Sequence, residues 1–76
     1  MEKAFILISC DVGSENELFS KLNEIDCVSS SIITYGEYDI VVEVETETPQ
    51  KMDEFVTQKI RKFSKIRSTI TLRVTA

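Results

Sequence analysis

The chain has 76 residues, of which 42% are hydrophobic, and its 13 acidic and 9 basic side chains give a net charge of −4. A domain this small removes only about 60% of its extended chain's surface from water on folding, so we expect association to add stability. The basic residues form no stripe that would neutralise phosphates, which argues against direct binding of nucleic acid. No apolar run approaches the roughly 20 residues that span a bilayer, which argues against a membrane partner.

The chain contains two cysteines, Cys10 and Cys27, and no histidine. Their separation matches no metal-binding or redox motif, so we expect both to be small buried residues with free thiols. Free thiols and the absence of a long apolar export segment before Cys10 favour a cytoplasmic protein.

The first two predicted elements are a central strand and a helix. Residues 3–10 are apolar at both odd and even positions, which is typical of a strand that is buried on both faces. After Gly13, Ser14 and Glu17 form the capping pattern S-x-x-E, and apolar residues then follow at helical spacing. These signals predict a helix over residues 15–25.

The next two elements are predicted strands joined by a glycine turn. Residues 27–35 are β-branched and rich in serine, which indicates an edge strand of low hydrophobicity. Gly36 supplies the turn. Residues 38–46 then alternate, with apolar side chains at even positions, so this strand is expected to bury one face.

The last two predicted elements are a helix and a strand. Thr48 and Pro49 have the residue types of a helix N-cap and first turn, and an apolar stripe follows over residues 49–63 with basic residues near its end. Residues 66–75 alternate again and predict the fourth strand.

The element order predicts one α+β domain over residues 1–76 with the ferredoxin-like βαββαβ topology, a four-stranded antiparallel sheet with two helices on one face. In the expected strand order 4-1-3-2, the first strand is central and Val41 shares its uncovered side. We therefore expect a homodimer packed sheet to sheet around an apolar centre. Acids of the third strand could meet Arg67 and Arg73 across the two stacked sheets.

Few residues favour catalysis or a cofactor. Without histidine there is no histidine base, and neither cysteine has a basic neighbour in sequence that would activate it. Glu43, Glu45 and Glu47 alternate on one strand face, but without neutral ligands they favour a solvated or interfacial acidic face over a metal site. RNA binding on the sheet would require aromatic and basic residues interleaved there. We therefore expect a non-enzymatic domain with no cofactor and no metal.

The turn "TYGEYD" at residues 34–39 has two interpretations. An amino acid carries a carboxylate and an ammonium, so its site needs amide or hydroxyl donors close to an acidic acceptor. The backbone at Gly36, the carboxylate of Asp39 and the hydroxyls of Thr69 and Thr71 are groups of these kinds. The alternative is a plain hairpin, in which Gly36 only supplies positive φ and the threonines only favour a strand.

The stretches "TYGEYDIVVEVET", "IRKFSKI" and "RSTITLRV" together resemble the effector-binding RAM domain of the Lrp/AsnC (feast/famine) transcriptional regulators. The resemblance covers essentially the whole chain. It implies a non-enzymatic domain that forms dimers and then a ring, commonly of eight subunits, and binds an amino-acid effector between dimers. Carried over by position, the implied ligand-binding residues are Tyr35, Gly36, Glu37, Tyr38, Asp39, Ser68, Thr69 and Thr71.

The resemblance also raises the question of what the domain regulates. Full-length members of that family carry a helix-turn-helix DNA-binding domain before this one, and none precedes Met1, so we expect a stand-alone form. Transcription would then be reached through mixed assembly with full-length Lrp/AsnC regulators. The sequence departs from the family at Tyr35, where a small residue is commoner, and in the polar second strand.

Two other functions stay open. The chain could be a purely structural oligomerisation module that binds no metabolite. It could also be an ACT-type small-molecule-binding domain, whose ligand turn follows the first strand, since "DVGSENEL" around Gly13 faintly resembles that turn.

Overall fold

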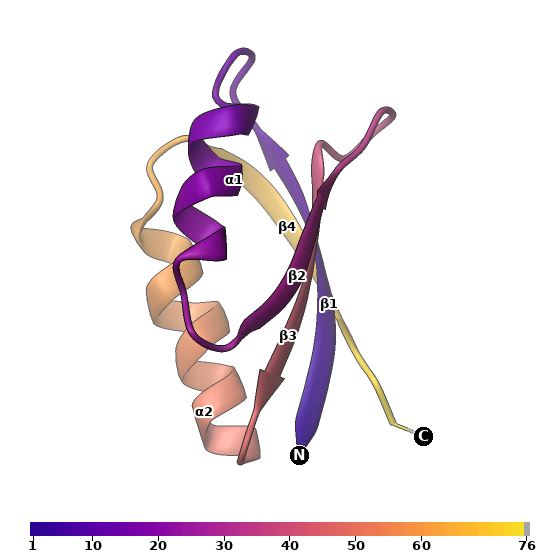
Figure 1. The fold of residues 1–76 in the computed structure, drawn as a ribbon, viewed down its shortest axis with the longest axis vertical. Helices are drawn as coiled ribbons and strands as arrows, with labels where there is room; N and C mark the ends of the chain where they lie inside the picture. The colour runs from indigo at the N-terminus through magenta and orange to yellow at the C-terminus, as the bar shows by residue number, and fades with distance from the viewer. Residues whose placement is uncertain (76) are drawn as a thin grey trace.

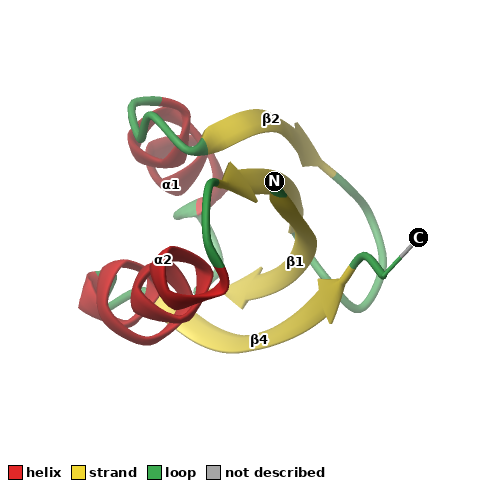
Figure 2. Cartoon of the chain, turned by 90° about the horizontal axis from the view of Figure 1, so that it is seen from below, coloured by secondary structure: helices red, strands yellow, loops and turns green. Residues whose placement is uncertain are grey.

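The computed structural model describes residues 1–75 and confirms the ferredoxin-like prediction (Figure 1). The sheet is antiparallel in the order β2-β3-β1-β4, and both helices lie on one side of it, inside its curve (Figure 2). No helix of the described residues is long and apolar enough to cross a membrane. In chain order the elements are β1 (Glu2–Cys10), α1 (Glu15–Asn23), β2 (Val28–Ile33), β3 (Ile40–Thr46), α2 (Pro49–Glu54), a π-helix η1 (Phe55–Lys59), a 3-10 helix η2 (Ile60–Lys62) and β4 (Ile66–Arg73).

The side of the sheet that faces the helices holds the hydrophobic core. Even-numbered residues of the two central strands point to this side, as their alternation predicts. They pack against the apolar stripes of the helices. The fully buried side chains with the largest volumes are Ile6, Ile8, Leu22, Ile40, Val42, Val44 and Met52.

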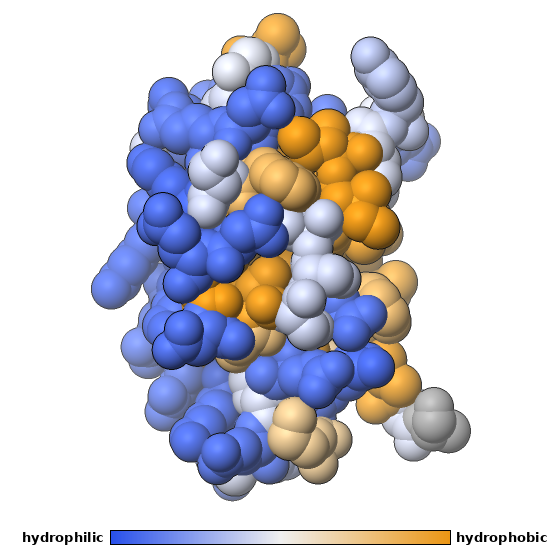
Figure 3. All heavy atoms as spheres, viewed as in Figure 1, coloured by the Kyte–Doolittle hydropathy of each residue, from blue (hydrophilic) through white to orange (hydrophobic). Residues whose placement is uncertain are grey.

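The other side of the sheet carries apolar residues that no helix covers. Leu7 of β1 pairs with Val41 on one flank and with Ile70 on the other, and residues paired in register point to the same side. Ile32 and Leu72 are 59% and 51% exposed. Figure 3 shows polar atoms over much of the helix side and apolar atoms gathered along the sheet side. We define the open face as Phe5, Leu7, Ile32, Val41, Ile70 and Leu72.

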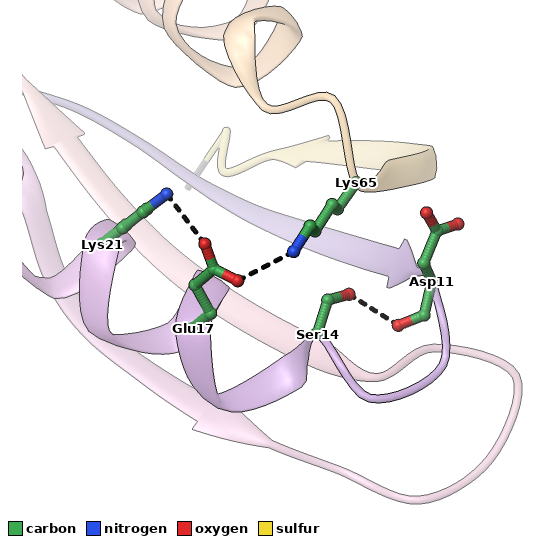
Figure 4. Close-up of polar contacts among 5 residues, drawn as sticks. All are labelled: Asp11, Ser14, Glu17, Lys21 and Lys65. Atoms are coloured by element: carbon green, nitrogen blue, oxygen red, sulfur yellow. Dashed lines mark hydrogen bonds and ion pairs between the residues drawn. The ribbon is translucent and has the colours of Figure 1, made fainter.

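The start of α1 differs from the predicted capping box. Ser14 is the N-cap residue, but its hydroxyl makes no cap and instead donates a hydrogen bond of 2.6 Å to the carbonyl of Asp11. Glu17 turns away from the helix start and lies between Lys21 and Lys65, at 3.0 and 2.9 Å (Figure 4). The S-x-x-E prediction was therefore right about where the helix begins and wrong about its hydrogen bonds.

The second helical segment is less regular than the single helix expected over residues 49–63. Its start is as predicted, because the hydroxyl of Thr48 accepts a hydrogen bond of 3.2 Å from the Lys51 amide. After Glu54 the chain widens into a π-turn, in which the Ile60 amide donates to the carbonyl of Phe55, and then tightens into a 3-10 turn. The segment packs on the helix side of the sheet with its apolar stripe inward.

The expected meeting of Arg73 with acids across stacked sheets is wrong for this residue. Arg73 pairs with Ala4, whose side chain is buried beneath the helices, so Arg73 points to the helix side and its guanidinium lies 3.0 Å from Asp53. On the sheet's other side, Lys3 lies 3.7 Å from Glu43 and 3.6 Å from Glu45. Partners within the same subunit therefore already neutralise these acids in part.

Candidate ligand site

The hairpin between β2 and β3 is held by its own hydrogen bonds. The amide of Thr34 donates to the carbonyl of Asp39 at 2.8 Å, and its hydroxyl donates to the carbonyl of Tyr38 at 2.8 Å. Gly36 has φ of 131°, in the region that favours glycine, and an added Cβ would meet nothing within 4 Å. Glycine is therefore required here by conformation, and the space beside it is open.

Asp39 ties the hairpin to the end of β1. Its amide donates to the carbonyl of Ile8 at 2.8 Å, and its Oδ2 accepts a hydrogen bond of 2.9 Å from the amide of Cys10. A carboxylate accepts through both oxygens, so one such bond leaves Asp39 with capacity for a donor from a ligand. The sequence indicated a charge at Asp39 but not its hydrogen bond with the Cys10 amide, because Asp39 and Cys10 are 29 positions apart.

A cavity of about 370 Å³ lies between the hairpin and the start of α1. Two of its lining side chains, Glu15 and Asp39, are acidic, and none of the described lining residues is basic. We call this cavity the hairpin pocket; its residues are Glu15, Asn16, Ile33, Thr34, Tyr35, Gly36 and Asp39.

The other two predicted hairpin residues lie outside this lining. Glu37 is exposed in the turn, and Tyr38 is partly buried. Tyr35 is fully exposed, so its ring is free to contact another molecule. The hairpin pocket therefore contains three of the five predicted hairpin residues, Tyr35, Gly36 and Asp39.

The predicted residues of β4 lie elsewhere. Ser68 and Thr69 line a second hollow of about 380 Å³, between the second helical segment and β4, and Thr71 is outside the lining of both hollows. Thr69 and Thr71 pair with Ile8 and Ile6, which places them toward the helix side. The central strand β1 separates them from the hairpin, and two strand spacings amount to about 10 Å. One subunit therefore does not bring the two predicted halves together.

Sequence reasoning missed two features of the surface. Arg61 and Arg67 line the second hollow beside Ser68 and Thr69, and only the helix and strand assignments together would have placed them there. A larger cavity of about 560 Å³ lies between the α1–β2 connection and α2, and includes Cys27. Within residues 1–75, no group of three or more cysteine and acidic side chains is arranged to hold a metal ion.

Both cysteines are free thiols in the structure. Cys10 is buried, as expected, whereas Cys27 is only partly buried. Burial raises the pKa of both thiols above the ordinary value, which keeps them protonated at neutral pH. Neither therefore has the character of an activated nucleophile.

Comparison with known protein families identifies the fold's relatives. The model of the Lrp/AsnC ligand binding domain matches residues 3–76. The chain belongs to this family. The resemblance drawn from its hairpin and last strand is thus confirmed, and the Lrp/AsnC family is regulatory. Comparison with curated proteins gave no match.

Solved structures agree with the assignment to the Lrp/AsnC family. FFRP-DM1 has a TM-score of 0.96 and 41% identity, over 99% of this chain and 100% of that chain. The AsnC protein of E. coli has a TM-score of 0.91 and 26% identity, over 99% of this chain but only 51% of that chain. The transcriptional regulator NMB0573 of Neisseria meningitidis, solved in complex with L-Met, has a TM-score of 0.85 over 99% of this chain and 50% of its own; at 18% identity it shows the fold alone.

Proposed function

We propose that this Lrp/AsnC domain senses an amino acid, which it binds between dimers so that the effector favours one assembly over another. The observation that carries the proposal is the hairpin pocket, which combines two carboxylates with the open backbone of Gly36. A carboxylate pair suits the ammonium of an amino acid, and exposed amides suit its carboxylate. The volume of about 370 Å³ is within the range of small-molecule sites.

The separation of the two predicted halves supports a site that two subunits share. Tyr35 to Asp39 lie at the hairpin, whereas Ser68, Thr69 and Thr71 lie beyond β1. A single amino acid is too short to contact both groups within one subunit, since about 10 Å of sheet separates them. A second subunit that presents its β4 side to the hairpin would complete the site.

The open face supports dimers as the unit of assembly. Six apolar side chains there have no helix over them, and three of these, Ile32, Ile70 and Leu72, are exposed in the single chain. Exposed apolar surface that is contiguous typically marks an interaction site. An effector bound between such dimers would shift assembly only through its different affinity for the two states. We expect the dimers to associate into ring-like oligomers in the cytoplasm. We also expect mixed assembly with full-length Lrp/AsnC regulators.

The complex of NMB0573 with L-Met supports an amino acid as the class of effector. We expect a binding free energy of about −4 to −8 kcal/mol for such a regulatory site, which corresponds to millimolar to micromolar dissociation constants. With such affinities, the fraction of sites that are occupied changes with the concentration of the free metabolite.

The test is to add the free amino acids one at a time and to measure thermal stability and oligomer distribution. We expect at least one of them to change both. Asp39→Asn keeps an acceptor for the Cys10 amide but removes the charge, so it should abolish the response without unfolding the end of β1. Asp26→Asn, which removes an acid that lines the cavity near α2, is the matched control and should respond as the wild type does.

Two results would redirect the proposal. If no amino acid changes stability or assembly while the oligomer persists, the chain is a structural oligomerisation module. If an amino acid binds but its contacts map to Gly13 and not to Gly36, the ACT-type arrangement is correct. Gly13 also has positive φ, 87°, with open space beside it.

A further inference from the structure

The second hollow contains an unusual group of side chains for an acidic protein. Its floor is apolar and its walls carry two arginines and three hydroxyls. Ile60 is buried in this floor, while Phe63 and Ile66 are partly buried and pack against the core. We call this hollow the basic groove; its residues are Val56, Thr57, Ile60, Arg61, Phe63, Ile66, Arg67, Ser68 and Thr69.

The arginines of the basic groove, Arg61 and Arg67, are among the four basic residues that form no ion pair within residues 1–75, the others being Lys59 and Lys62. None of the described residues that line the groove is acidic, although the chain as a whole has 13 acids and a net charge of −4. The basic residues that do form ion pairs are Lys3, Lys21, Lys51, Lys65 and Arg73.

Both walls of the groove depart from regular geometry. On the strand wall, Cys10 pairs with Ile66 while Ser9 pairs with Ser68, so Arg67 is the extra residue of a β-bulge. On the helix wall, the π-turn contributes Val56 and Thr57, and the following 3-10 turn contributes Arg61. Bulges redirect a side chain, and π-turns occur frequently at functional sites. Regular elements would present different residues along this groove.

We propose that the basic groove is a binding site for a small organic anion that has an apolar chain and no ammonium, such as a 2-oxo acid. The guanidinium groups of Arg61 and Arg67 bind its carboxylate, for which their planar donor sets are well suited. The apolar floor takes the hydrocarbon chain, and the volume of about 380 Å³ accommodates a molecule of this size.

The groove differs in ligand class from the hairpin pocket. The hairpin pocket has acids and no base among its described lining residues, whereas the basic groove has bases and no acid. Within one subunit, an ammonium in the groove would lose its hydration and lie near two positive charges without a carboxylate to pair with. The groove should therefore prefer the oxo acid to the amino acid that has the same carbon skeleton.

The experiment compares 4-methyl-2-oxopentanoate with L-leucine by NMR titration of the full 76-residue chain. Amide resonances of Arg61, Arg67 and Thr69 should shift with the oxo acid, and should shift much less with leucine at the same concentration. Acetate, which has the carboxylate but no apolar chain, should bind more weakly than the oxo acid.

Substitutions then assign the binding to the arginines. Arg61→Gln and Arg67→Gln should each weaken binding of the oxo acid by about tenfold or more, because each removes charge-assisted hydrogen bonds to the carboxylate. Lys59→Gln and Lys62→Gln change the net charge equally but lie outside the groove lining, so they should weaken it far less. Arg67→Lys keeps the charge but not the planar donors, so its affinity for the oxo acid should lie between those of the wild type and Arg67→Gln.

Several results would overturn the proposal. These are no shift with the oxo acid, shifts that map away from the groove, or an equal loss in the lysine controls, which would indicate only general charge attraction. Leucine is tested separately, and its response should depend on Asp39 whereas oxo-acid binding should depend on Arg61 and Arg67, so failure of this site is distinguishable from failure of amino-acid sensing at the hairpin.

Discussion

The two faces of the sheet are built from similar residues but end in different surroundings. On the helix side, Ile6 and Ile8 of β1 are fully buried beneath α1 and the second helical segment. On the other side, Leu7 of the same strand remains partly exposed beside Val41 and Ile70. The difference shows that the single chain completes one core and leaves a second apolar surface without a covering layer.

This asymmetry has an energetic consequence. Apolar surface removed from water contributes roughly 25 cal/mol per Å², so the open face represents stabilisation that the single chain leaves unused. A second copy that presents the same face would recover it symmetrically. The following variants, in order of decreasing expected effect, separate what each face contributes.

The largest effect is expected from Leu7→Asp on the open face. In a two-fold dimer the change places two uncompensated carboxylates in the interface, each costing about 3 to 5 kcal/mol. Sedimentation should therefore show a folded monomer where the wild type sediments as a larger species. Ile70→Asp, at a residue that is 42% exposed on the edge strand, should act in the same direction.

The matched control for these variants is Val12→Asp. Val12 is 95% exposed and lies in the turn after β1, away from the open face. It should leave the sedimentation unchanged. If Leu7→Asp also sediments like the wild type, the open face is not the dimer interface.

The neighbouring residue on the covered face should behave differently. Ile8→Ala removes buried methyl groups from a side chain with 0% exposure, and such changes cost about 2 to 5 kcal/mol of unfolding free energy. Denaturant unfolding of a monomeric Leu7→Asp background would measure this cost without a contribution from association. A loss below about 1 kcal/mol would mean that the site collapses around the smaller residue.

A smaller effect is expected where the second helical segment begins. Thr48→Ala removes the hydroxyl that accepts from the Lys51 amide, which should cost about 0.5 to 2 kcal/mol. Thr48→Ser retains this acceptor and should remain close to the wild type. Equal destabilisation by both variants would show that the methyl group of Thr48, and not its cap, is what matters.

The smallest effect is expected at Glu17, and it should depend on pH. Lys65 and then Lys21 hold the pKa of Glu17 below its ordinary value of 4.5. Because the pKa is lower in the folded state, the stabilisation is present above that ordinary value and is lost as the pH falls through the folded pKa. Glu17→Gln should therefore lower the melting temperature slightly at neutral pH and not at strongly acidic pH.

Glu24→Gln is the control for Glu17→Gln, since Glu24 is exposed and forms no ion pair within residues 1–75. Added salt should reduce the Glu17 effect, as it does for solvent-exposed pairs. A difference between wild type and Glu17→Gln that persists at strongly acidic pH would have a cause other than this charge cluster.

Much of the fold could be predicted from the sequence because its signals are local. Alternation in residues 38–46 gave the buried face of β3 correctly, and the turn at Gly36 follows from the need for positive φ. The hydrogen bonds of Glu17 could not be predicted, because Lys65 is 48 positions away and competes with the local capping box. The π-turn at Phe55–Lys59 also lacked a signal, since the apolar stripe continues through it.

The candidate site was harder to predict than the fold. The sequence identified Gly36 and Asp39, which the hairpin pocket contains, and Thr69, which belongs to the basic groove. The predicted strand order already placed the first strand between them, as the structure confirms; the side of the sheet on which Thr69 and Thr71 lie came only from the structure. Arg61 and Arg67 were not singled out as partners of a ligand, because their meeting depends on packing of the second helical segment against β4 and on a bulge.

The most direct test of the central claim is native mass spectrometry of the wild-type chain at micromolar concentration, with and without a mixture of free amino acids. We predict dimers or larger even-numbered assemblies, a bound amino acid retained in them, and a change in their distribution when it is added. A stable monomer whose spectrum is unchanged by every amino acid would contradict both the role of the open face and the sensing function.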